Sequence, residues 1–165
     1  MRITMTAVAL FALLACFNQP GWAQSPHFID SKTTANIESN GDLRVSFKEA
    51  GLADTATTYS LTATADATCT CVTNSGRCPN AANKLTFASQ EATQGTFNPK
   101  NGTVSATLTL TAPGCPTSKS PTCGGGQTLE LSAIDYHNVA LTDVTHNVSA
   151  SGLPSEVSVT LFTCP

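Results

Sequence analysis

Two groups of residues in this 165-residue sequence have side chains that could do chemistry, the histidines with acidic neighbours and the cysteines. Asp135-Tyr136-His137 is the one place where an acid and a histidine lie together. Side chains two apart on a strand share a face, so Asp135 could orient the His137 imidazole in a small hydrolase. No Gly-x-Ser-x-Gly motif supplies a nucleophile, and an acid–histidine pair alone is not a catalytic site. We therefore prefer a polar patch at a strand end, assign no catalytic residue, and keep the hydrolase as an alternative.

The cysteines are better explained by disulfide bonds than by metal binding. Six cysteines in an exported domain usually form three disulfides, and spacing alone does not choose the pairing. Two of them, Cys69 and Cys71, point the same way on one strand and cannot easily bond each other. Cys78 could close a small loop with either one. Zinc sites usually show Cys-x2-Cys spacing or nearby histidines, and neither occurs, so we expect no metal and no cofactor. The six are Cys69, Cys71, Cys78, Cys115, Cys123 and Cys164.

The N-terminus predicts export. Residues 1–23 resemble a signal peptide, with Arg2 before an apolar run at 7–15 and small residues at Gly21 and Ala23. We expect a mature chain from Gln24, one domain over 24–165, and a secreted location, with the periplasm or the outer surface as variants. Cys16 lies in a box like those of lipoproteins, so a lipid-anchored envelope protein is an alternative. No other apolar stretch approaches the ~20 residues of a membrane helix.

The amino-acid composition limits the classes of partner that the chain is expected to bind. Charged residues make up 12% of the chain, about half the roughly 25% typical of globular proteins. The net charge is −3 and no basic cluster occurs, so a nucleic-acid partner is not expected. The only tryptophan lies in the signal segment, which makes stacking on neutral sugars less favourable.

Alternating apolar and polar residues predict strands almost throughout the mature chain. For Ile37 to share a face with Leu43, and Ala35 with Val45, the loop between these two runs must contain three residues, 39–41. Such a loop requires a left-handed last residue, which Gly41 supplies.

Further strands are expected around 58–72, 85–87, 104–110, 129–141 and 157–161. The apolar positions change parity near Ala133 and Ile134, which predicts a bulge. No window shows helical periodicity. Seven to nine short strands predict an antiparallel β-sandwich, immunoglobulin-like in the broad sense and stapled by disulfides, with a closed barrel as the alternative.

Several segments resemble a group of small secreted proteins of bacteria and filamentous fungi with no known activity. They are HFI at 27–29, VSFKEAGL at 45–52, TYSLTATADATCTCV at 58–72, PNAANK at 79–84 and CGGGQTLELSAIDYHNVALTD at 123–143. The resemblance implies secretion and a β-rich fold. It also implies a bridge between Cys71 and Cys123, whereas the other four cysteines depart from the pattern and leave their pairing open.

The leading hypothesis is a secreted domain without enzymatic activity that works by surface interaction with an unknown protein or glycan. Cysteines pin two loops, 73–84 and 113–126, and loops on a rigid β scaffold are where recognition is commonly placed. We therefore predict binding residues at Asn80, Asn83 and Lys84. The oligomeric state is not predicted.

Overall fold

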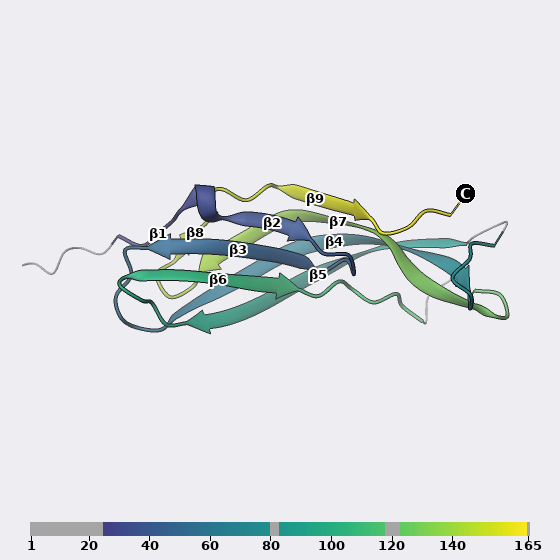
Figure 1. The fold of residues 1–165 in the computed structure, drawn as a ribbon, viewed down its shortest axis with the longest axis horizontal. Coiled ribbons are helices and arrows are strands. Elements are labelled where there is room, and N and C mark those ends of the chain that lie inside the picture. Colours follow the sequence, from purple (N-terminus) through teal and green to yellow (C-terminus); the bar gives the residue numbers. More distant parts are fainter. Residues whose placement is uncertain (1–24, 80–82, 118–122, 165) are drawn as a thin grey trace, which may run out of the picture.

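The computed structural model describes residues 25–79, 83–117 and 123–164. Figure 1 shows two layers of strands in an elongated molecule, with one short 3-10 helix and no longer helix in the described ranges. The elements are β1 (His27–Phe28), η1 (Asp30–Lys32), β2 (Thr34–Ile37), β3 (Leu43–Ala50), β4 (Thr57–Thr73), β5 (Lys84–Phe97), β6 (Thr103–Leu110), β7 (Gln127–Asp143), β8 (Val148–Ser149) and β9 (Glu156–Thr160).

The two sheets are antiparallel throughout. In sheet A, β3 pairs with β6 on one side, and β1 and β2 lie one after the other along its other side. In sheet B, the order is β5-β4-β7, and β8 and β9 follow one another along the far side of β7. The predicted disulfide-stapled β-sandwich is confirmed and the barrel is excluded. The strands are longer than expected, because β4 and β7 each have 17 residues and β5 has 14.

The core between the sheets follows from the period-two alternation of the strands. Leu43, Val45 and Phe47 of β3 face Tyr59 and other buried residues of β4. The ring centroids of Phe47 and Tyr59 lie 4.6 Å apart, and Phe28 and Phe97 pack at their edges. Aromatic pairs of this kind add about 0.5–1.5 kcal/mol beyond the burial of their surface.

The β2–β3 hairpin has the predicted three-residue loop. Ala35 lies opposite Val45, and Ile37 lies opposite Leu43. Gly41 has a φ of +92°, and its amide donates to the Glu38 carbonyl at 2.9 Å. A side chain at this glycine would meet Leu131 Cδ2 at 2.9 Å, so conformation and space both require glycine.

Two bulges in β7 decide which of its side chains face solvent. The first inserts Ser132 between the partners of Thr68 and Cys69, one position before the predicted site at Ala133 and Ile134. The second, not predicted, lies between the partners of Thr62 and Thr64, where Asn138 has a φ of +53°. Between the bulges, Ile134 and Tyr136 face the core, so Asp135 and His137 face outward.

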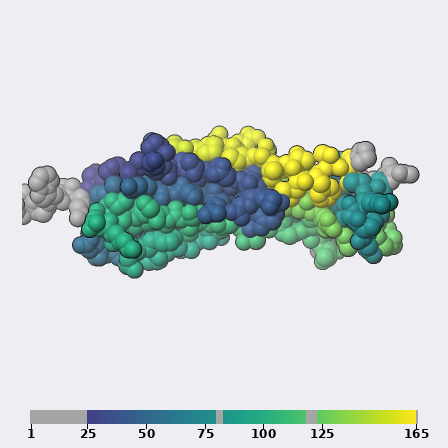
Figure 2. Space-filling view, in the orientation of Figure 1, coloured from purple at the N-terminus to yellow at the C-terminus, as the bar shows by residue number. Residues whose placement is uncertain are grey.

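Sheet B is longer than sheet A. In Figures 1 and 2, the ends of β4, β5 and β7 extend beyond β3 and β6 as a narrower projection, accompanied by the C-terminal segment. We call this part the cystine tip and define it as residues 69–78, 83–87, 111–117, 123–131 and 161–164. Cys69, Cys71 and Val72 are buried here although they lie outside the main core cluster, so the bridges and the segments they hold replace the second sheet.

Candidate functional site

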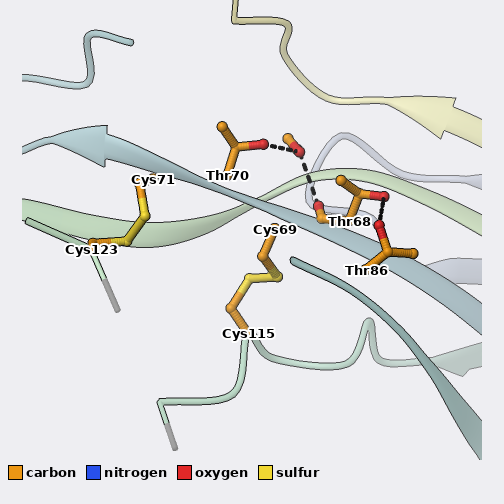
Figure 3. Close-up of a disulfide and its surroundings, with 8 residues drawn as sticks. Thr68, Cys69, Thr70, Cys71, Thr86, Cys115 and Cys123 are labelled. Carbon is orange, nitrogen blue, oxygen red and sulfur yellow. Dashed lines mark hydrogen bonds between the residues drawn. A yellow bond between two sulfur atoms is a disulfide. The ribbon is translucent and has the colours of Figure 1, made fainter. Parts of the chain in front are cut away.

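Three disulfides build the cystine tip. Cys69 bonds Cys115, Cys71 bonds Cys123, and the Cα atoms of the two pairs lie 6.0 and 5.6 Å apart. Figure 3 shows both bridges leaving β4 on the same side, toward the segment after β6 and the segment before β7. The structure thus contains the Cys71–Cys123 bridge that the resemblance implied.

Cys78 does not close the small loop with Cys69 or Cys71 that its position in the sequence would allow. Cys78 bonds Cys164, 86 residues further along the chain. Cys69 and Cys71 are buried and face the segments that carry their own partners, whereas Cys78 lies beyond the turn that ends β4. The C-terminal segment is thereby held at the same end of the molecule as that turn.

The predicted binding residues lie in part on this tip. Asn83 and Lys84 are exposed at the start of β5, and Asn80 lies outside the described residues. The Asn83 carbonyl accepts a hydrogen bond from the Cys71 amide at 3.0 Å, so this backbone is fixed while the side chains point to water. Their role in binding stays a prediction.

His137 belongs to a polar cluster on the outer face of sheet B. Its Nε2 lies 3.0 Å from Asp66 Oδ2 and 3.8 Å from Asp135 Oδ2. Glu156 of β9 lies directly opposite His137 in the ladder, and Asp66 lies directly opposite Asp135. We call these four residues the carboxylate–histidine cluster. Sequence reasoning found the two members on β7 and missed the two on the neighbouring strands.

The cluster has no nucleophile for the hydrolase alternative. The only side-chain hydrogen bond of His137 among the described residues is to Asp66. Thr64 lies opposite His137, but the described residues show no hydrogen bond between its hydroxyl and His137; that hydroxyl accepts one from Gln90 at 2.8 Å. The side chains of His137 and Asp135 are about one-third exposed, at 32% and 33%, on an open sheet face. The hydrolase gains no support from this arrangement.

A second polar surface lies on the opposite side of the sandwich. Two adjoining hollows of about 510 and 370 Å³ share Lys48 and Ser105 in their walls. We call the combined feature the lysine groove, and Figure 2 faces the β3 and β6 surface on which it lies. Its walls contain Lys32, Lys48, Lys100, Phe97, Asn98, Asn101, Ser46, Phe47, Thr103, Val104, Ser105, Ala106 and Thr107.

The groove is positive although the chain is negative overall. Three lysines line it, no carboxylate does, and none of the three forms an ion pair within the described ranges. Ser46 and Thr107 share a hydrogen bond of 3.0 Å across β3 and β6. The lysines come from η1, β3 and the β5–β6 turn, which explains why no basic run appears in the sequence.

A buried acidic pair lies at the end of the core near β8. The Glu49 side chain is fully buried, and neither of its oxygens has a hydrogen-bond partner among the described residues. Burial raises the pKa of Glu49; the nearby Tyr59 hydroxyl opposes that shift and Asp143 adds to it. Asp143 itself is satisfied by two backbone amides and by His146 Nδ1 at 2.6 Å.

Comparisons give no further guide to function. No model of a known protein family matches the chain, and no curated protein sequence matches it either. Within the described residues, no helix is long and apolar enough to cross a membrane.

Proposed function

We propose that this chain is a secreted, non-enzymatic binding domain, immunoglobulin-like in the broad sense, whose lysine groove binds acidic polysaccharides. The groove itself supports this proposal most directly. Lysines there supply charge, while Asn98, Asn101 and the hydroxyl residues supply neutral hydrogen-bond groups. Sugars that carry carboxylates offer the matching anions and hydroxyls.

The negative net charge does not oppose such a ligand. At physiological salt the screening length is about 8 Å, so a ligand in the groove responds mainly to the nearest charges. The charged residues in the walls of the groove are Lys32, Lys48 and Lys100. The cluster with Asp66, Asp135 and Glu156 lies on the outer face of the other sheet.

A protein partner is the less favoured choice. Centres of protein interfaces are enriched in aromatic and other large apolar side chains. Across the described residues, Val144 is the one exposed large hydrophobic side chain, at 47% exposure. A hydrophilic, charged ligand fits this surface better.

Secretion rests on the sequence of residues 1–23 and is supported by three disulfides, which persist in oxidising compartments. Lipid anchoring through Cys16 stays the competing proposal, and both residues 1–23 and Cys16 lie outside the described residues. The intact mass of the exported protein separates the two. A chain that begins at Gln24 supports secretion, and a diacylglycerol-sized addition at Cys16 supports the anchor.

The experiment is a binding titration of the oxidised protein against polygalacturonate, with dextran and single-stranded DNA as other arms. We expect saturable binding to polygalacturonate that weakens as salt rises, and no binding to dextran. Lys48→Glu and Lys100→Glu should each weaken it at least about tenfold, because rim charges control encounter and binding of an anionic partner.

Lys84→Glu is the matched control, because it makes the same charge change on the cystine tip. Lys84 and Phe97 lie at opposite ends of the 14-residue strand β5, so about 40 Å of strand separates Lys84 from the groove. Unchanged affinity in this variant supports the groove. If Lys84→Glu loses binding while Lys48→Glu binds fully, the binding site lies on the cystine tip and not in the groove. If the protein prefers single-stranded DNA to polygalacturonate, the acidic-polysaccharide proposal is wrong.

A further inference from the structure

The carboxylate–histidine cluster gathers three carboxylates around one basic side chain, His137. Asp66 and Asp135 lie directly opposite each other on β4 and β7, and like charges in that relation destabilise a sheet. Glu156 adds a third carboxylate opposite His137. No lysine or arginine forms an ion pair with any of the three within the part of the chain that the structure describes.

The spacing of the donor atoms is that of a metal-binding group. One ligand atom from each of Asp135, His137 and Glu156 lies within 4.8 Å of the other two. His137 Nε2 lies 3.0 Å from one carboxylate oxygen and 3.8 Å from another. Donors bound tetrahedrally at 2.0–2.1 Å from a zinc ion lie about 3.3 Å apart, so small side-chain movements suffice.

One carboxylate oxygen of the cluster lacks a hydrogen-bond partner within the described residues. Asp135 Oδ1 is shielded from solvent and has no hydrogen-bond partner within the described residues. A buried carboxylate oxygen without a partner is costly, and either a cation or a donor would satisfy it. A cation bound here would satisfy this Asp135 oxygen and would also offset the repulsion between the opposed carboxylates of Asp66 and Asp135.

We propose that Asp135, His137 and Glu156, with Asp66 beside them, bind one divalent transition-metal ion, for which Zn²⁺ is the best match. Imidazole favours Zn²⁺ over Mg²⁺ or Ca²⁺, and carboxylates complete the common zinc donor set. The two strands that carry the three ligands, β7 and β9, pair in sheet B, which holds the donors close together. This inference is independent of the polysaccharide proposal, because the cluster and the groove lie on different sheets.

The test is a calorimetric titration of chelator-treated, oxidised protein with ZnCl2. We expect one saturable site per chain, and at least about tenfold weaker binding in His137→Gln and in Glu156→Gln, because each loses a metal ligand. All these side chains lie on the outer face of the sheet, so both variants should fold, which circular dichroism and a thermal melt establish.

Two matched controls complete the design. Glu130→Gln removes the same charge from an exposed position on β7, and His27→Gln removes an exposed histidine far along the chain. Both should bind Zn²⁺ as the parent does. Absence of saturable binding, equal affinity in His137→Gln and the parent, or equal losses in the control variants would overturn the proposal.

Discussion

Cys69–Cys115 and Cys71–Cys123 run side by side from β4, and this arrangement predicts how their contributions to stability combine. Their sequence separations are 46 and 52. Closed alone, a loop of this size is worth about 4 kcal/mol in the chain-entropy relation. Once one bridge has formed, however, the other closes a ring of only about ten residues, made from 69–71 and 115–123, worth about 2.7 kcal/mol.

The free energies of unfolding should therefore be non-additive. Replacing either pair by alanine should cost about 2.7 kcal/mol, and replacing both should cost about 6.7 kcal/mol, which leaves a coupling of about 1.3 kcal/mol. The cavity left by each bridge costs the same whether or not the other bridge is present, so the cavity costs add in the double variant and cancel from the coupling. Urea unfolding followed by circular dichroism measures each value, with sucrose present if the double variant is marginal.

Cys78–Cys164 provides the internal control. The ring it closes is about 48 residues when Cys71–Cys123 is intact and about 58 when only Cys69–Cys115 remains, so its cost should stay near 4 kcal/mol in both backgrounds. Coupling near zero for the neighbouring bridges, with single costs near 4 kcal/mol, would refute the reasoning. So would an equally large coupling to Cys78–Cys164.

Three further predictions concern the core. Glu49→Gln should stabilise the protein by about 1–3 kcal/mol at pH values above the raised pKa of Glu49, where the parent must bury a carboxylate that lacks a hydrogen-bond partner among the described residues. Burial raises the pKa of Glu49 in the fold, so the parent loses stability as pH rises from below 4.5 through that raised value. Urea melts should show the gain of the variant vanish at low pH, and a gain that grows toward acid would contradict this. Tyr136→Phe should cost about 1–3 kcal/mol in the same assay, because the hydroxyl donates to the Gly41 carbonyl at 3.0 Å; a neutral result would show that water replaces it. Gly41→Ala should lower the melting temperature, because φ is positive and the added Cβ meets Leu131; an unchanged melting temperature would mean that this loop relaxes freely.

The alternation of apolar and polar residues along the sequence was enough to predict much of the fold. The requirement that Ile37 and Leu43 share a face was enough to predict a three-residue hairpin loop with a left-handed Gly41. The same kind of pattern placed the first β7 bulge within one residue. The second bulge was missed, although the change from Tyr136 to Val139 and Leu141 contains the same parity signal.

The candidate sites were harder to predict from the sequence, because their residues come from strands that are distant from one another along the chain. Asp66 lies 71 residues from His137, and nothing local indicates that the register will set it 3.0 Å away. Lys32, Lys48 and Lys100 likewise meet only through the topology of sheet A and the β5–β6 turn. The polar length of β5 was also missed, because a strand at the edge of a sheet does not need a continuous apolar pattern.

The central claim, that the lysine groove is the binding surface, is tested most directly by mapping contacts residue by residue. Amide chemical shifts of the oxidised, isotope-labelled protein should be followed during titration with a short acidic galacturonate oligosaccharide. Binding in the groove predicts shift changes that saturate together around Lys48, Ser105 and Asn101, with little change at Asn83 and Lys84. Changes confined to the cystine tip, or none at any residue, would contradict the account.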